Sequence, residues 1–317
     1  MPKNLKKILF IDSVHPILEE RLLDLDYVCE HDLKSPKEAL ELRIDQYFGL
    51  VIRSRFPIDK PFLNKAKNLK FIARSGAGLE NINVAYAEQK GVTVFNSPEG
   101  NMDAVGEQAI GMLLMLFNQL KKGDLEVRKG TWDREGNRGL ELSKKTVGII
   151  GYGNMGRALA KKLSGFGCDV MAYDKYKKGF ESEIIKEVDL ATIFQETDVL
   201  SIHLPLSEET YHYVNVDFLA KFKKPIYMIN TARGNNVCIG DLVSGLKNKR
   251  VLGACLDVLE YETKSFETIS AEELPEDFQY LAKSDKVIFS PHVAGWTQES
   301  YVKLSSFLAD KIEKKFS

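Results

Sequence analysis

Short apolar runs alternate with segments of helical periodicity along most of the chain. Several runs are continuous in Val, Ile and Leu, as expected for strands buried on both faces of a parallel sheet. This alternation predicts an α/β fold with parallel sheets and right-handed crossovers. The expected strands cover residues 7–11, 50–53, 71–73, 93–95, 146–150, 170–173, 199–203, 226–230, 253–257 and 287–289.

The longest helical pattern predicts one helix over residues 101–129, whose middle is dense in Ala, Ile, Leu and Met. So apolar a helix should be buried, either inside its own chain or partly against a second subunit. A second, amphipathic helix is expected over 297–315, after the last strand, from where it could return to the first domain. The acidic stretch 263–284 is interpreted as a solvated surface loop.

A glycine motif follows the strand predicted at 146–150. Gly151, Gly153 and Gly156 form G-x-G-x-x-G before a helical segment, and Asp174 closes the next apolar run. The glycines permit a tight turn, close approach of the backbone to a pyrophosphate and close helix packing. Asp174 would accept hydrogen bonds from ribose hydroxyls and disfavour a 2′-phosphate, which predicts NAD as the cofactor. The neighbouring Lys175, Lys177 and Lys178 are either solvated or able to tolerate NADP.

The composition of the chain limits the classes of protein to which it can belong. A chain of 317 residues is long enough for about two domains, and a net charge of −1 gives no electrostatic case for nucleic-acid binding. The four cysteines include no C-x-x-C pair, which is typical of reduced thiols in a cytoplasmic protein. No apolar run is long enough to span a membrane, no signal peptide is recognisable, and no metal is expected.

Three polar residues follow predicted strands on the same rim as the glycine motif, where ligands of open parallel sheets collect. Arg233 offers a planar fork to a carboxylate and a carbonyl oxygen. His292 can accept a hydroxyl proton, and Glu262 can orient its imidazole and favour its charged form. Together they suit oxidation of a 2-hydroxy acid. Each residue taken alone could instead be structural.

These motifs resemble those of the D-isomer-specific 2-hydroxyacid dehydrogenase family over nearly the full chain. The resemblance rests on the glycine motif with Asp174, on residues 203–206 and 230–234, on Asp257 with Glu262, and on Pro291-His292. It implies two Rossmann-like or flavodoxin-like domains, with the active site in the cleft between them. Residues 1–100 plus 296–317 would form the substrate-binding domain and 101–295 the NAD-binding domain. A homodimer through the long helix is also implied.

The resemblance further implies roles for individual residues. Arg233, Glu262 and His292 would form the catalytic triad, with Asp257 near the nicotinamide. The cofactor-binding residues would be Gly151, Gly153, Asn154, Met155, Gly156, Asp174, His203, Pro205, Thr210, Thr231, Ala232, Asp257 and His292.

The segment 73–81 is similar to the substrate loop of D-3-phosphoglycerate dehydrogenases, whose backbone N–H groups would hold a substrate carboxylate. The expected substrate-binding residues are Arg53, Arg74, Ser75, Gly76, Ala77, Gly78 and Asn101. Arg53, Arg55 and Arg74 could bind a phosphate or could be ordinary salt-bridged groups. Phe56 and Trp296 stand where the family often has small residues, and Trp296 could reshape the pocket. The regulatory C-terminal domain of longer phosphoglycerate dehydrogenases would be lacking.

The sequence therefore predicts an NAD-dependent dehydrogenase, with D-3-phosphoglycerate as the first substrate hypothesis and serine biosynthesis as its pathway. The alternative within the same class is a glyoxylate/hydroxypyruvate reductase or a D-lactate-type enzyme. The alternative from another class is an NAD(H)-sensing binding protein, because the family includes transcriptional co-repressors. No basic patch or extended tail favours that alternative.

Overall fold

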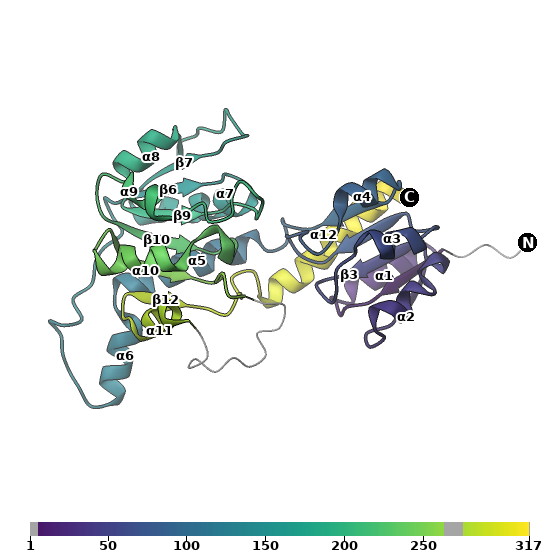
Figure 1. Ribbon diagram of the computed structural model, residues 1–317, viewed down its shortest axis with the longest axis horizontal. Helices are drawn as coiled ribbons and strands as arrows, with labels where there is room; N and C mark the ends of the chain where they lie inside the picture. The colour runs from purple at the N-terminus through teal and green to yellow at the C-terminus, as the bar shows by residue number, and fades with distance from the viewer. Residues whose placement is uncertain (1–5, 263–274, 317) are drawn as a thin grey trace, which may run out of the picture. The chain divides into compact units, whose positions relative to one another are not determined.

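The computed structural model describes residues 6–262 and 275–316 and divides into two compact units (Figure 1). Unit 1 comprises Met1–Met102 and Trp296–Ser317, and unit 2 comprises Asp103–Gly295. The predicted α/β fold with parallel sheets is confirmed, because every pair of named strands in the two sheets is parallel. The predicted excursion 263–284 lies partly outside the described residues.

Unit 1 contains a five-stranded sheet in the order β2-β1-β3-β4-β5. Its strands are β1 (Lys7–Phe10), β2 (Val28–His31), β3 (Gly49–Ile52), β4 (Phe71–Arg74) and β5 (Thr93–Asn96). Its helices are α1 (Ile17–Asp24), α2 (Lys37–Glu41), α3 (Lys60–Lys65), α4 (Val84–Gln89) and α12 (Gln298–Phe316), with a 3-10 turn at Ile44–Gln46. The final helix thus belongs to the unit formed by the N-terminal strands.

Apolar clusters cover both faces of the first sheet. Ile8 and Phe10 pack on one face with Leu308 and Ile312 of α12, while Leu9 packs on the other face. This arrangement follows from the continuous apolar sequence of β1 and β3, in which alternate side chains point to opposite faces. Side chains of α1 and α12 also pair: Arg21 binds Asp310 at 2.6 Å and Glu313.

Unit 2 contains a seven-stranded sheet in the order β12-β11-β10-β9-β6-β7-β8. Its strands are β6 (Thr146–Ile150), β7 (Asp169–Tyr173), β8 (Lys186–Glu187), β9 (Val199–Ile202), β10 (Ile226–Asn230), β11 (Val251–Leu256) and β12 (Val287–Phe289). Its helices are α5 (Met102–Phe117), α6 (Leu120–Arg128), α7 (Asn154–Leu163), α8 (Leu190–Glu196), α9 (Val216–Ala220), α10 (Ile239–Lys247) and α11 (Glu276–Lys283), with 3-10 turns at Ser164–Phe166 and Gly234–Asn236. Two apolar clusters fill the space between the sheet and its helices.

The prediction of a single helix over residues 101–129 is wrong, because two helices occupy this region. The chain breaks between α5 and α6 at Gln119, whose φ of 50° lies in the left-handed region and cannot continue a helix. Most apolar residues of α5 are buried in the core of unit 2, which favours burial within one chain. Among its described residues α6 buries no side chain, and Figure 1 shows it projecting from this unit.

Other elements also differ from the sequence expectations. The edge strand β2 was not predicted, because its Glu30 and His31 interrupt the apolar pattern that marks buried strands. The two-residue strand β8 lies at the edge of the second sheet and is too short to be recognised. Residues 276–283 form α11, whereas a loop was expected. Within the described residues, no helix is long and apolar enough to cross a membrane.

Candidate active site and coenzyme site

The predicted site residues of unit 2 follow the carboxyl ends of its strands. Because the strands are parallel, these ends lie along one edge of the sheet. The glycine motif follows β6, Asp174 follows β7, His203 follows β9, and Arg233 follows β10. Asp257 and Glu262 follow β11, and His292 follows β12. The sheet therefore places the predicted triad and the predicted coenzyme loop on the same rim.

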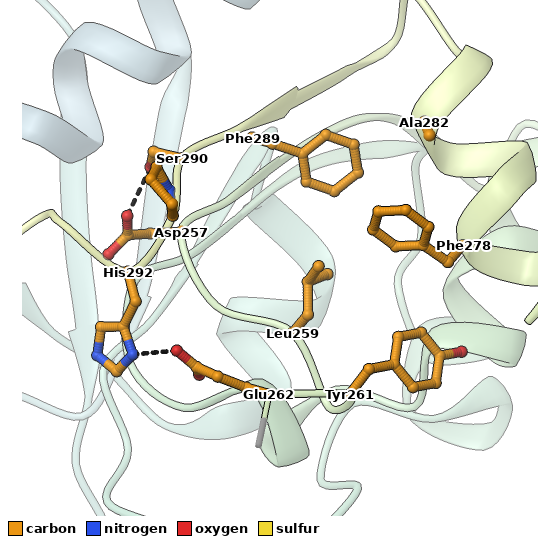
Figure 2. A pocket seen from close by; sticks show the side chains of 10 residues that line it. Asp257, Leu259, Tyr261, Glu262, Phe278, Ala282, Phe289, Ser290 and His292 are labelled. Atoms are coloured by element: carbon orange, nitrogen blue, oxygen red, sulfur yellow. Dashed lines mark hydrogen bonds and ion pairs between the residues drawn. The ribbon is translucent and has the colours of Figure 1, made fainter. Parts of the chain in front are cut away.

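His292 and Glu262 form a direct pair through the imidazole Nδ1 and a carboxylate oxygen (Figure 2). The hydrogen bond to Glu262 raises the pKa of His292 above its ordinary value, although burial acts in the opposite direction. Because Nδ1 is held by Glu262, Nε2 is the nitrogen left to exchange a proton with a substrate. The pair thus has the arrangement of a general base and its orienting carboxylate.

Asp257 fixes the loop that carries His292. It is 2 % exposed, and its carboxylate accepts hydrogen bonds from Ser290 Oγ at 2.6 Å and from the Val293 and Ala294 amides, both at 2.9 Å. Its backbone carbonyl accepts the His292 N–H at 2.8 Å. These bonds hold His292 at a φ of 54°, an uncommon conformation for a residue with a side chain.

Arg233 lies near the pair because two loops approach closely. A Cβ on Gly234 would come within 1.9 Å of the Leu259 carbonyl oxygen, so only glycine fits between the loops after β10 and β11. The Arg233 guanidinium donates to the Ala232 carbonyl at 2.7 Å. Its positive charge lies close enough to lower the pKa of His292, opposing the larger effect of Glu262. Unit 2 therefore brings together all three members of the predicted triad.

An apolar pocket of about 340 Å³ borders the pair. Figure 2 shows His292 and Glu262 at one side of this pocket and the rings of Phe278 and Phe289 at the other. Leu259, Tyr261 and Ala282 also contribute to its lining. The pocket thus places an apolar wall next to the His292–Glu262 pair.

The glycine loop has the shape expected for a dinucleotide site. Gly151 has a φ of 92°, and a Cβ on Gly156 would come within 2.2 Å of the Gly151 carbonyl oxygen. Apart from the adjoining residues of the chain, no described atom lies within 4 Å of the position of a Cβ on Gly153, so the backbone is open to a ligand there. The helix α7 begins at Asn154, followed by Met155, and its first N–H groups are suited to phosphate.

Asp174 is held as a carboxylate beside this loop. It accepts hydrogen bonds from the backbone N–H of Tyr152 at 2.8 Å and of Tyr176 and Lys177 at 2.9 Å each. Burial acts to raise the pKa of Asp174, but these backbone bonds outweigh it and lower the pKa. Three of about four lone-pair positions are thus used, and one remains for a ribose hydroxyl.

The remaining predicted coenzyme residues line the loops after β9 and β10. His203 is half-buried, its Nε2 lies 2.8 Å from Ser201 Oγ, and burial lowers its pKa to about 4, so the ring is neutral. Thr210 Oγ1 donates to the Pro205 carbonyl at 2.6 Å, which makes Thr210 a brace of this loop. Ala232 is buried.

Two buried polar atoms in these loops are unsatisfied. In the described part of the chain, Thr231 Oγ1 and His203 Nδ1 have no hydrogen-bond partner. Buried polar groups rarely remain unpaired. Together with the open backbone at Gly153, these atoms fit a coenzyme that would supply the missing partners.

The predicted substrate residues belong to unit 1. Arg53 and Arg74 stand at the ends of the neighbouring strands β3 and β4, and Arg74 Nε donates to the Arg53 carbonyl at 3.2 Å. The loop Ser75, Gly76, Ala77, Gly78 follows β4. The Ser75 N–H already donates to the Ile52 carbonyl at 2.9 Å. The expectation that this N–H would bind a substrate carboxylate is therefore not met. Asn101 has a buried Oδ1 without a partner among the described residues.

Arg55 does not have the role considered for it as a phosphate ligand. Its guanidinium donates to the backbone carbonyls of Ile11 at 3.0 Å, of Asp32 and of Ser35. These bonds use the donors of Arg55 to hold neighbouring loops together, so it is a structural residue. The sequence could not reveal this, because the accepting groups are backbone atoms distant in the chain.

Trp296 contacts Arg53. The guanidinium carbon of Arg53 lies 4.2 Å from the centre of the indole ring, within the range of a cation–π interaction. Burial lowers the pKa of Arg53, although its interactions with Asp12 and Tyr301 act in the opposite direction. The bulky residue noted in the sequence thus orients one of the predicted substrate arginines.

Comparison with known proteins places these features in a family. Residues 110–294 match the NAD binding domain of the D-isomer specific 2-hydroxyacid dehydrogenases. A hydroxypyruvate reductase of Thermotoga maritima is 34 % identical over 92 % of this chain and 91 % of its own length. A D-3-phosphoglycerate dehydrogenase of Archaeoglobus fulgidus is 32 % identical over 94 % of this chain, which spans only 55 % of that relative.

A solved structure of D-lactate dehydrogenase from Aquifex aeolicus, in complex with NAD and lactic acid, has the same fold. It superposes with a TM-score of 0.80 at 26 % identity, covering 98 % of this chain and 95 % of that one. The matched family domain binds NAD, which confirms the predicted cofactor. The chain belongs to the D-isomer specific 2-hydroxyacid dehydrogenase family.

Proposed function

We propose that this protein oxidises D-3-phosphoglycerate to 3-phosphohydroxypyruvate with NAD, using Arg233, Glu262 and His292 as catalytic residues. The carrying observation is that a histidine paired with a carboxylate lies beside an arginine on the rim that also bears the coenzyme loop. A substrate-binding role for unit 1 is part of the same proposal.

The proposed reaction moves one proton and one hydride. The His292 Nε2 takes the proton of the C2 hydroxyl, while Glu262 stabilises the imidazolium that forms. The Arg233 guanidinium holds the substrate carboxylate and the carbonyl oxygen that develops at C2. A bound NAD would supply the acceptor for the hydride that leaves C2. In the reverse direction, protonated His292 returns the proton to the oxygen.

Two arginines of unit 1 support a phosphorylated substrate. Arg53 and Arg74 end neighbouring strands beside the loop 75–78, and Arg53 is oriented by Trp296. Arginine forks match the geometry of phosphate oxygens and bind them through charge-assisted hydrogen bonds. Arg53 and Arg74 would therefore recognise the phosphate, and the amides of 76–78 and Asn101 would contact the rest of the substrate.

Substitution of these arginines tests the substrate. We expect Arg74→Gln and Arg53→Gln to lower kcat/KM for D-3-phosphoglycerate by roughly 10- to 100-fold, the effect of losing a charge-assisted hydrogen bond. Activity with hydroxypyruvate and glyoxylate should change far less. NADH absorbance measures every reaction. Lys67→Gln is the matched control, because it removes the same charge from an exposed position of unit 1.

Three results of the same assay would contradict this proposal. Equal losses with glyoxylate would mean that the arginines bind the carboxylate common to all substrates. Preference of the unaltered protein for unphosphorylated acids would reject D-3-phosphoglycerate. Tight NADH binding with negligible turnover of every acid would favour an NAD(H)-sensing protein.

Reduction of glyoxylate or hydroxypyruvate is the second candidate. Two observations favour it. The guanidinium of Arg55 donates to backbone carbonyls and so is not available for a phosphate, and the Thermotoga hydroxypyruvate reductase is matched over 91 % of its length. A D-lactate-type substrate belongs to the same class of unphosphorylated acids.

A homodimer is also part of the proposal. The projecting α6 and the segment after it expose large apolar side chains, which include Leu120, Leu125, Val127 and Trp132. Exposed apolar surface of this kind is typical of an interface between subunits. A role in serine synthesis and a cytoplasmic location stay predictions.

A further inference from the structure

A cluster of three side chains links two loops beside the coenzyme loop of unit 2. Lys175 and Tyr176 directly follow Asp174, and both contact Glu209. The Glu209 carboxylate pairs with Lys175 Nζ and accepts a hydrogen bond of 2.7 Å from the Tyr176 hydroxyl. Lys175 Nζ also lies 5.4 Å from the centre of the Tyr176 ring. Lys175, Tyr176 and Glu209 are called the Glu209 bridge below.

The order of the strands places this bridge at the ribose end of the coenzyme site. The loops that it joins follow β7 and β9, and β6 lies between these strands. The glycine loop follows β6. The bridge therefore connects the two loops that flank Gly151 and Gly153. It begins one residue after Asp174, whose carboxylate would bind the ribose of a coenzyme.

The position of Glu209 is set by a well-ordered turn. The adjacent Thr210 is buried, and its Oγ1 donates to the Pro205 carbonyl at 2.6 Å and accepts the Ser207 N–H at 2.8 Å. The Asn236 side chain donates to the Thr210 carbonyl at 3.0 Å. Although the Glu209 carboxylate is itself exposed, its backbone is held by buried hydrogen bonds. These bonds fix the part of the loop from which the Glu209 side chain reaches Lys175.

We infer that Glu209 is a second determinant of selectivity for NAD over NADP, and that it acts through Lys175. A 2′-phosphate adds about −1.5 to −2 charges and requires a nearby cation. Lys175 is the cation directly after Asp174, but the carboxylate of Glu209 pairs with it and neutralises its charge. Of the other local cations, Lys178 donates to the Asp174 carbonyl at 3.1 Å and Lys177 lies 3.5 Å from the Tyr152 carbonyl.

Direct coenzyme binding tests this inference. The dissociation constants of NADH and NADPH are measured by titration without substrate, for the unaltered protein and for Glu209→Gln. We expect NADPH to bind about threefold to tenfold more tightly to the variant, because loss of the Glu209 carboxylate leaves the charge of the exposed Lys175 available to the 2′-phosphate. NADH affinity should change less than about twofold, and the gain for NADPH should shrink at high salt.

Two further variants distinguish this role from a structural one. Glu208→Gln removes the same charge from the neighbouring exposed residue and should leave the ratio of the two affinities unchanged. Lys175→Gln in the Glu209→Gln background should remove the gain for NADPH. The inference is overturned if Glu209→Gln and Glu208→Gln have equal effects, or if Glu209→Gln weakens both coenzymes alike. These measurements involve only the coenzyme, so they test the inference independently of the proposed substrate.

Discussion

Replacing His292 by Gln is expected to lower kcat for oxidation of a 2-hydroxy acid by about 10²- to 10⁴-fold, the usual contribution of a general base. Gln can occupy the space of the imidazole, but it cannot take the hydroxyl proton. The hydrogen bonds of Asp257 to the loop use backbone groups and Ser290, so the loop should keep its conformation. The measurement is steady-state NADH formation, with NADH binding by fluorescence as the check on the coenzyme site.

His31→Gln is the matched control for this variant. His31 also pairs with a carboxylate, at 3.0 Å from Glu19, but it lies on the edge strand of unit 1 outside the proposed site. Its replacement should leave kcat unchanged. Normal turnover of the His292→Gln protein with every acid tested would contradict the assignment of the base.

Gly234→Ala is expected to impair both stability and turnover. The added Cβ would meet the Leu259 carbonyl oxygen at 1.9 Å and the Glu260 nitrogen at 2.6 Å, and neither backbone atom can move without shifting its loop. Overpacking of this kind costs about 1–3 kcal/mol of unfolding free energy. The shift would also separate Arg233 from the His292–Glu262 pair, and a displacement of about 1 Å can lower the rate about 100-fold.

Thermal unfolding and kcat/KM measure these two effects. Gly165→Ala is the control, since no described atom lies within 4 Å of its Cβ position and it should be tolerated. Unchanged kcat/KM in Gly234→Ala would show that the close approach of the two loops does not position Arg233.

The sequence predicted the strands of both sheets well where they are buried on both faces. The run at 146–150 matches β6, because Val and Ile occupy consecutive buried positions. The edge strands β2 and β8 and the break between α5 and α6 could not be predicted from the sequence pattern. β2 is half-buried and polar, and the break at Gln119 depends on one left-handed residue with no glycine to mark it. Local pattern alone cannot predict such a conformation.

In the candidate site, too, the sequence predicts some features and not others. Arg233, Glu262 and His292 were recognisable because reactive residue types follow apolar runs. The contacts that hold them were not, because they join residues far apart in the chain. Asp257 was expected near the nicotinamide, yet its carboxylate accepts three hydrogen bonds from residues 290–294. The tight fit at Gly234 and the contact between Glu209 and Lys175 likewise depend on the packing of separate loops.

The pH dependence of oxidation tests the central claim that Glu262 tunes His292 as the base. Oxidation requires the neutral imidazole, so kcat/KM should rise as the pH passes the pKa of His292 in the free enzyme. The hydrogen bond to Glu262 raises this pKa. In Glu262→Gln the raising effect is lost, so the rise should move to lower pH, with a lower plateau. A rise at the same pH in both proteins would contradict the account.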